Sequence, residues 1–374
     1  MGRVGAGAAA CDGVGWSLGV EEEFLLVDRG SGGTVADAER VLRDAGRAPG
    51  IAVDATVQPE LLATQVEAAT GRCSTLAGLA HQLRHNRRRL AAAAGELLLV
   101  PSGVPVIAGQ RRFTVGERFE RIAGRYAGLV REYQACGCHV HVGVPDPEAA
   151  VAVVNHVRPW LPTLLALSVN SPVLHGADTG YASWRMVEQS RFPGSGVPPR
   201  FSSARDYAAR VGRLVAAGAL IDPAQSFWLV RPSPRLPTVE FRVADVSIDV
   251  DGALLQAALS RALVRTALAD AAAGRPVPEL DEQVAAAAVW SAARYGLDGP
   301  AVHPLLARRV PAVALVGDLV ETVRPALIET GDLTTVERLL KTLVTGAERQ
   351  RAAGAPTEIV KMLAEAALQD GDAG

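Results

Sequence analysis

Alternating and continuous apolar stretches predict strands in the first two thirds of the chain. The stretch from Trp16 to Asp28 is mostly apolar and predicts a strand, although three consecutive glutamates interrupt it. The β-branched residues of 57–70 favour a second strand. Further strand-like stretches, bounded by proline and other turn residues, cover residues 97–100 and 136–144 and two pieces within 225–248.

Helical spacing dominates the remaining positions. Almost everything after Asp251 is helical and alanine-rich, and earlier helical stretches cover residues 76–95, 117–134, 147–169 and 203–217. Strands come first and helices last, without regular βαβ alternation, so the sequence predicts an α+β fold with a mostly antiparallel sheet. The polar region 170–201, rich in glycine and proline, is too long for an ordinary connection and is a candidate active-site loop.

Composition excludes several classes of protein. The 374 residues carry a formal net charge of −2, which argues against a nucleic-acid-binding face. The longest charge-free run, Pro159 to Ala177, contains three prolines and predicts a buried helix and loop rather than a membrane span. Four cysteines do not form a disulfide framework. We therefore expect a cytoplasmic protein, with residues 1–14 as a flexible extension and no signal peptide.

Four predicted strands present polar pairs at a spacing of two, and residues two apart share one face of a strand. Any one pair is explained by a solvated sheet edge, but four on apolar strands indicate a face whose acids meet a cation. Several carboxylates on one face suit Mg²⁺ or Mn²⁺, and more than one such ion suggests ATP. Glu22 is expected on the opposite face. The pairs are Glu21 with Glu23, Gln65 with Glu67, His139 with His141, and Glu240 with Arg242.

Arginines in the same regions supply the complementary charge. Arginine binds phosphate and carboxylate oxygens in a bidentate manner and stabilises charge on a transferring phosphoryl group. Surface solubility or pairing with the glutamates is the alternative explanation. The run Arg87–Arg89, by contrast, is expected to form a solvated helix face. No P-loop is present, so use of ATP would depend on metals and arginines. The candidate arginines are Arg185, Arg231, Arg235 and Arg242.

The segment CGCHVH does not predict a zinc site. In a strand, Cys136 and Cys138 face away from His139 and His141, so the four side chains cannot surround one ion. The cysteines are expected to be buried small hydrophobic residues. The histidines are either structural or part of the polar face.

The segments GVEEEFLLVD, QVEAAT, CHVHVG, GYASWR and RPSPRLPTVEFRVAD occur in this order from about Gly15 onward. In this respect the chain resembles the glutamate–cysteine ligase type 2 family, in particular its YbdK-type carboxylate–amine ligases. The resemblance implies a glutamine-synthetase-like fold, with a curved antiparallel sheet, helices on its outer face and the active site on the concave face. It also implies ATP- and Mg²⁺-dependent joining of L-glutamate, through an acyl phosphate, to an amine such as that of L-cysteine.

The resemblance also implies roles for individual residues. Arg185 and Arg242 would lie near the transferring phosphoryl group and the substrate carboxylate, and the loop after Arg185 would select the acceptor. Substrate or ATP binding would involve Arg231, Arg235 and His141. The metal ligands would be Glu21, Glu23, Glu67, His139 and Glu240.

Two other functions remain open at this stage. A two-metal amidase or phosphatase could use the same acids with water as the acceptor and no ATP. A non-catalytic family member could bind nucleotide or amino acid without turnover. The leading hypothesis is the ATP-dependent carboxylate–amine ligase, with residues 15–370 as a single catalytic domain. Its partners would be small molecules rather than nucleic acid or membrane. A homodimer is expected from oligomer statistics.

Overall fold

The computed structural model describes residues 15–47, 52 and 54–369, so the predicted extension 1–14 lies outside the described residues. Within this part, seven strands form one sheet in the order β2-β3-β1-β5-β9-β8, with β4 also pairing with β1. Every pairing is antiparallel, which confirms the predicted sheet type. The strands are β1 (Leu18–Asp28), β2 (Thr56–Pro59), β3 (Gln65–Ala69), β4 (Leu97–Val100), β5 (Gly137–Gly143), β8 (Val230–Pro232) and β9 (Thr238–Asp245).

Helices make up most of the rest of the described chain. They are α1 (Ala38–Arg47), α2 (Leu76–Ala94), α3 (Glu117–Tyr126), α4 (Gly128–Arg131), α5 (Pro147–Val157), α6 (Leu161–Ser168), α7 (Trp184–Ser190), α8 (Ala204–Ala216), α9 (Val250–Ala272), α10 (Glu282–Tyr295), α11 (Ala312–Thr330), α12 (Leu333–Thr342), α13 (Gly346–Ala353) and α14 (Pro356–Ala366). Side-chain caps fix several starts: Thr75 accepts a hydrogen bond from the Gly78 amide at the start of α2, and Asp249 does the same for Gly252 in α9.

Three predicted elements differ from the structure. The stretch 57–70 forms two strands, β2 and β3, rather than one. The predicted helix 117–134 breaks at Ala127, which has a φ of 47° and separates α3 from α4. The C-terminal part is not wholly helical, because β10 (Pro300–His303) pairs with β11 (Arg308–Pro311). The candidate loop 170–201 contains α7 and a second small hairpin, β6 (Val173–Leu174) with β7 (Ala177–Asp178).

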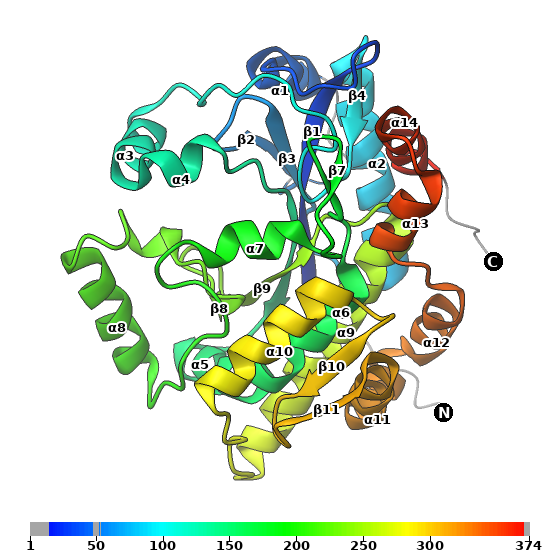
Figure 1. Ribbon diagram of the computed structural model, residues 1–374. Coiled ribbons are helices and arrows are strands. Elements are labelled where there is room, and N and C mark those ends of the chain that lie inside the picture. Colours follow the sequence, from blue (N-terminus) through cyan, green and yellow to red (C-terminus); the bar gives the residue numbers. More distant parts are fainter. Residues whose placement is uncertain (1–14, 48–51, 53, 370–374) are drawn as a thin grey trace, which may run out of the picture.

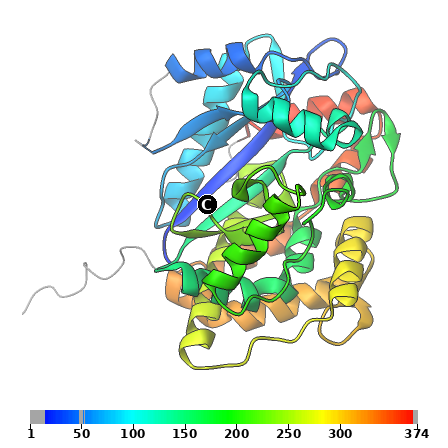
Figure 2. The same ribbon diagram turned by 90° about the vertical axis from the view of Figure 1, so that its left-hand side faces the viewer.

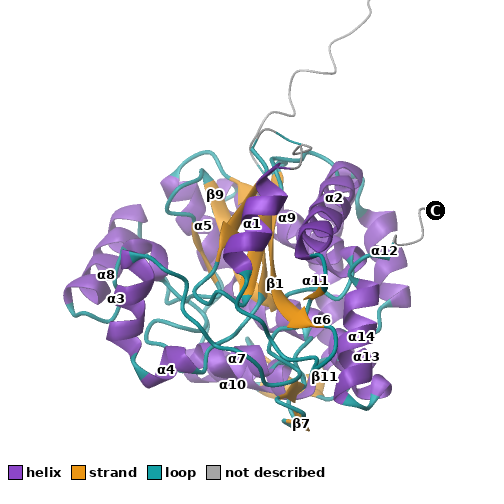
Figure 3. Ribbon diagram, turned by 90° about the horizontal axis from the view of Figure 1, so that it is seen from above, coloured by secondary structure: helices purple, strands orange, loops and turns teal. Residues whose placement is uncertain are grey.

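Helices cover one face of the sheet, and helices cover the other face less completely. In Figures 1 and 3, α2, α9, α13 and α14 lie on one side of the strands, while α3, α4 and α8 stand on the opposite side. Figure 2 looks from that second side and shows the strands running behind green helical segments. The long helix α9 packs against β5, α2, α5 and α11. No helix among the described residues is both long and apolar enough to cross a membrane, and α6 is buried throughout.

Arg87 corrects the prediction of a solvated arginine face on α2. Its side chain is only 1% exposed and donates to the Glu22 carboxylate over 3.0 and 2.6 Å. Three further hydrogen bonds run from Arg87 to the carbonyl oxygens of Ser247, Ile248 and Asp249. Period-two alternation did place Glu22 on the face away from Glu21 and Glu23, and this buried ion pair is what it meets there.

Arg87→Ala is expected to lower the free energy of unfolding by about 3–5 kcal/mol, because it leaves the buried Glu22 carboxylate without its partner. Urea unfolding followed by circular dichroism measures the change. Arg43→Ala is the matched control, since Arg43 pairs with Glu39 on the exposed surface of α1 at 2.9 Å and should change stability by about 0.5 kcal/mol or less. If the two variants lost the same free energy of unfolding, the conclusion that burial makes the Arg87–Glu22 pair important for stability would be wrong.

Candidate active site

The sheet register brings the predicted polar pairs into one group. Residues directly opposite each other in an antiparallel pair share a face and lie close together. Across β3, β1, β5, β9 and β8, the opposite residues are Glu67 with Glu23, Glu21 with His139, His141 with Glu240, and Glu240 with Arg231. The side chains that alternation places on one face of each strand therefore lie together on one side of the sheet, opposite the side that carries Glu22.

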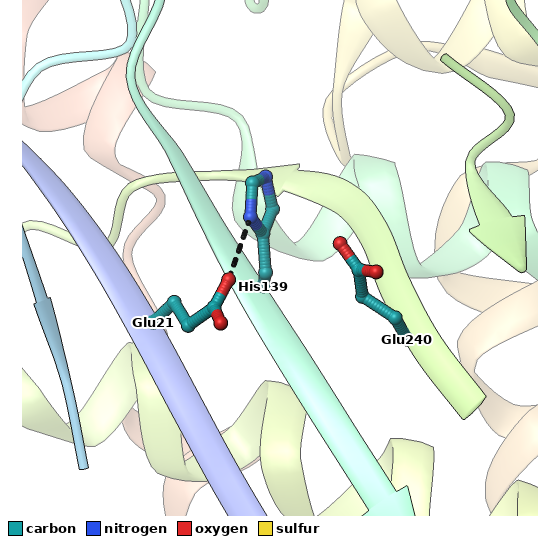
Figure 4. A group of neighbouring side chains, drawn as sticks. All are labelled: Glu21, His139 and Glu240. Carbon is teal, nitrogen blue, oxygen red and sulfur yellow. Dashed lines mark hydrogen bonds and ion pairs between the residues drawn. The ribbon is translucent and has the colours of Figure 1, made fainter. Parts of the chain in front are cut away.

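Glu21, His139 and Glu240 form the first part of this group. Their side chains come from β1, β5 and β9 and point toward one another (Figure 4). One Glu21 oxygen lies 3.4 Å from His139 Nδ1, and the other lies 3.3 Å from His141 Nε2. One potential ligand atom from each of Glu21, His139 and Glu240 lies within 4.8 Å of the others, which is compatible with a shared cation.

Glu23, Glu67 and His139 form the second part, with ligand atoms that also lie within 4.8 Å of one another. His139 Nε2 is 3.8 Å from Glu23 Oε1, so this ring contacts both parts of the group. Glu60 joins them through a hydrogen bond with Glu67, a contact that sequence reasoning missed. Gln58 also donates a hydrogen bond to Glu67.

Several carboxyl groups in this second part have raised pKa values, so their protonated forms are favoured. Burial, reinforced by the Glu23 charge, raises the pKa of Glu60 to about 7. Burial and the nearby Glu60 raise the pKa of Glu67 well above its usual value, and burial also raises that of Glu23. Like-charged carboxylates this close together need a shared proton or a cation. An oxygen-rich, buried acidic group therefore fits a hard divalent cation.

The first part of the group has the opposite electrostatic character. Burial opposes ionisation of Glu21, but hydrogen bonds from His139 and His141 outweigh it and lower the pKa of Glu21. Burial and the Arg242 charge lower the pKa of His139 to about 4. The His139 ring is thus neutral near pH 7 and has a lone pair available for a metal ion.

Two of the predicted arginines bind Glu240 on the same face. Arg231 donates to its carboxylate from Nε over 2.8 Å and from Nη2 over 3.1 Å. Arg242 pairs with the same carboxylate. Burial disfavours the charged form of Glu240, but Arg242 and Arg231 outweigh it and hold its pKa well below the usual range. In the described structure, Glu240 therefore meets guanidinium groups as well as the two histidines.

Arg185 reaches the group from α7, in the candidate loop region. Its Nη2 donates to the Arg242 carbonyl oxygen over 3.1 Å, and its Nη1 lies 3.7 Å from the Asp245 carboxylate. Asp245 is fully buried and accepts hydrogen bonds from Ser171 and Ser183, over 2.7 and 2.8 Å. The structure thus places one side chain of this loop beside the group of acids, and adds Asp245 as a partner that the sequence did not reveal.

Gly137 is a second contributor that sequence reasoning missed. Its amide donates to Glu23 Oε2 over 2.6 Å. A Cβ atom at this position would lie 2.4 Å from Arg185 Nη2 and 3.1 Å from His139 Nε2. The absence of a side chain is therefore what allows Arg185 and His139 to approach the start of β5.

The predictions for Arg235 and for the cysteines of the CGCHVH segment have different outcomes. Arg235 is exposed in the turn between β8 and β9, and the structure does not bring it into the group. Cys136 and Cys138 are fully buried among apolar residues, as predicted. The cysteines take no part in the group of acids and histidines found among the described residues.

Two solved structures share the fold of this chain. The structure of the Francisella tularensis glutamate–cysteine ligase in complex with AMP matches with a TM-score of 0.68 at 13% identity, covering 95% of this chain and 89% of that one. A bifunctional glutathione synthetase from Pasteurella multocida matches with a TM-score of 0.64 at 15% identity, covering 93% and 52%. At these identities the likeness defines the class by fold alone: an α+β protein with the fold of the Francisella glutamate–cysteine ligase.

Sequence comparison then gives the family. Residues 17–360 match the model of glutamate–cysteine ligase family 2 (GCS2). A Saccharopolyspora erythraea protein provisionally named glutamate–cysteine ligase 2-2 is 56% identical over 361 residues, covering 94% of this chain and 92% of the relative. A Mycolicibacterium vanbaalenii protein with the same provisional name is 46% identical over 367 residues, covering 95% and 99%. The chain belongs to glutamate–cysteine ligase family 2, which confirms the resemblance seen in its motifs.

Proposed function

We propose that the protein is an ATP- and Mg²⁺-dependent carboxylate–amine ligase of the glutamate–cysteine ligase type. It would convert L-glutamate, ATP and an amine, with L-cysteine as the first candidate, into a γ-glutamyl amide, ADP and phosphate. The observation that carries the proposal is the group of buried acids, histidines and arginines on one sheet face, in a chain of this family. Residues 15–370 would act as a single catalytic unit, since the group draws on strands from β1 to β9.

The donor set fits divalent metal ions. Crowded carboxyl groups with raised pKa values and the neutral His139 ring are suited to hold cations, and oxygen donors predominate, as Mg²⁺ prefers. Bound Mg²⁺ would offset the like charges of ATP and the substrate carboxylate and favour loss of the γ-phosphate. The residues that would hold it are Glu21, His139 and Glu240 in one group, and Glu23, Glu67 and His139, with Glu60 beside them, in the other.

The chain's own arginines would orient the reactants. Arg185 enters from α7 and donates to the Arg242 carbonyl oxygen, and the charges of both arginines act on the Glu23 carboxylate of the acidic group. There they can bind equatorial phosphoryl oxygens or a substrate carboxylate, and stabilise charge as the phosphoryl group moves. Arg231 holds Glu240 in place through two hydrogen bonds and is a binding residue in this scheme. Arg235, exposed on its turn, would contact substrate only at the rim.

Formation of ADP and phosphate from ATP, Mg²⁺ and L-glutamate tests the proposal. The assay is run with and without a panel of amines led by L-cysteine, and the product is identified by mass. ADP formation that needs both glutamate and an amine, with a matching γ-glutamyl product, is the expected result. No ATP turnover with any pair would overturn it. Metal-dependent hydrolysis of amide or phosphate esters under those conditions would indicate the two-metal hydrolase instead.

Gly137→Ala is expected to lower this activity by about 100-fold while the protein stays folded, because the new methyl group displaces Arg185 and His139 from their observed positions. Steady-state ADP formation measures the loss, and circular dichroism reports the fold. Gly19→Ala is the matched control on the neighbouring strand, since its Cβ would make only an ordinary 3.8 Å contact with His141. Full activity in Gly137→Ala would argue against the observed approach of Arg185.

A further inference from the structure

Asp245, the last residue of β9, belongs to neither group of potential metal ligands found among the described residues. Its carboxylate is fully buried and accepts three hydrogen bonds. The Ser171 hydroxyl and the Asn170 amide donate to Oδ2 over 2.7 and 2.9 Å. The Ser183 hydroxyl donates to Oδ1 over 2.8 Å. Burying a carboxylate is costly unless its oxygens are hydrogen-bonded, and here both oxygens are.

The two serines connect this carboxylate to the first turn of α7, which packs against β9 (Figure 1). The Ser171 hydroxyl accepts from the Arg185 amide over 3.1 Å. The Ser183 hydroxyl caps the helix and accepts from the Met186 amide over 3.2 Å. The Trp184 amide donates to the Ser171 carbonyl oxygen over 3.0 Å. Since the first amide groups of a helix have no partner within it, these contacts fix where α7 begins.

Asp245 also acts on the charged end of Arg185. Nη1 of the guanidinium lies 3.7 Å from the carboxylate, which is too far for a hydrogen bond but close enough for strong attraction between buried charges. Burial raises the pKa of Asp245, and the Arg185 charge and the three hydrogen bonds oppose this rise. The backbone and the guanidinium of Arg185 are therefore both held by one carboxylate.

The surroundings of Asp245 leave no room for another arrangement. Asp245, Ser171 and Ser183 are all 0% exposed, so water cannot readily replace a lost hydrogen bond. Gly103 packs so closely that a Cβ atom there would lie 2.9 Å from both Asp245 Oδ2 and Ser171 Oγ. A densely packed interior passes small displacements on to its neighbours, and the neighbour joined to both serines is the start of α7.

We propose that Asp245 is a positioning residue of the ligase reaction, acting through Arg185. It holds the start of α7 and the guanidinium in the orientation from which Arg185 can bind a phosphoryl or carboxylate oxygen. Asp245 itself does not touch the reactants, because its carboxylate is fully buried. The inference rests on the ligase function proposed above, and it extends the site to a buried layer formed by Asp245, Ser171 and Ser183.

Asp245→Asn tests this role, because asparagine keeps the size of aspartate but removes the charge and turns an NH2 group toward one of the hydrogen-bond donors. The turnover number for ADP formation should fall about 30-fold, with less change in the KM for ATP. In an Arg185→Ala background the same substitution should change the turnover number by less than about threefold, since no guanidinium remains to be positioned. Losses that multiply in the double variant would overturn the proposal, because Asp245 would then act independently of Arg185.

Asp332→Asn is the matched control. Asp332 is 4% exposed and accepts a hydrogen bond from Arg261 Nε of α9 over 3.1 Å. Its substitution should lower the unfolding temperature and leave the turnover number of the folded protein unchanged. An equal fall in turnover number in this variant would overturn the proposal, because the loss of any buried carboxylate would then suffice.

Ser171→Ala is a milder variant for the case that Asp245→Asn does not fold. It removes only the hydroxyl that joins the Asp245 carboxylate to the Arg185 amide. The turnover number should fall about tenfold in the folded protein. An unchanged turnover number would overturn the proposed link between Asp245 and the start of α7.

Hydrogen–deuterium exchange gives a readout that does not need turnover. The amides of α7 should exchange about tenfold faster in Asp245→Asn than in the wild-type protein, while those of α9 keep their exchange rate. Unchanged exchange in α7 would overturn the proposal that Asp245 holds this helix. If the wild-type protein shows no ATP turnover, the ligase proposal fails, and exchange in α7 still decides whether Asp245 positions Arg185.

Discussion

Glu21→Gln and Glu23→Gln should each reduce Mg²⁺-dependent ADP formation by about 100-fold or more, while the protein stays folded. Glutamine keeps the size of glutamate but removes the negative charge that a divalent cation needs. Glu21 lies beside both histidines, and Glu23 lies opposite Glu67 and near His139. ADP formation is measured over a range of Mg²⁺ concentrations, and Mn²⁺ binding by electron paramagnetic resonance gives a readout independent of turnover.

Glu22→Gln is the matched control, because Glu22 is the middle residue of the three consecutive glutamates. Its carboxylate lies on the other face and binds Arg87, so the substitution should lower the free energy of unfolding and leave metal binding by the folded protein intact. Activity is compared well below the unfolding midpoint of each variant. Equal loss of Mn²⁺ binding in all three folded variants would contradict the assignment of faces.

Much of the candidate site was predictable because a strand places alternate side chains on opposite faces. That rule grouped Glu21 with Glu23 and His139 with His141, and the register then placed these pairs next to each other. Which strands would be neighbours was not predictable from alternation. In the order β3-β1-β5-β9, neighbours are distant in sequence, since Glu21 and His139 are 118 positions apart, and the resemblance of the motifs implied an antiparallel sheet without its strand order.

Asp245 shows where alternation fails. Counting by two from Glu240 places Asp245 on the opposite face, but the register between β5 and β9 shifts between Cys138 and Val140. This irregularity puts Asp245 opposite Gly137, on the side that Arg185 reaches. A bulge redirects the side chains that follow it, and nothing in the local sequence marked this one.

Glu60 and Arg87 were missed for different physical reasons. Glu60 follows the last residue of β2, in a connection that the sequence pattern predicts as part of one continuous strand. Arg87 sits in a helix rich in arginine and alanine, where charge alone predicts exposure. Its burial depends on a carboxylate 65 positions earlier in the sequence, and such a tertiary contact leaves no local pattern.

Arg185→Lys should lower the turnover number of the ligase reaction by about 100-fold and change the KM for ATP less. Lysine keeps the charge but lacks the planar guanidinium, which in Arg185 reaches the Arg242 carbonyl and the vicinity of Asp245 together. A single ammonium group cannot keep these contacts and also bind two phosphoryl oxygens. Separate determination of kcat and KM distinguishes the loss of transition-state stabilisation from weaker ATP binding.

Arg191→Lys is the control for this substitution, because Arg191 directly follows α7 and pairs with Glu188 of the same helix. It should leave kcat nearly unchanged. A loss of thermal stability in Arg185→Lys with unaltered kcat would mean that Arg185 only anchors α7 to β9. A fall in kcat with normal stability is the result expected if its guanidinium stabilises charge on the transferring phosphoryl group.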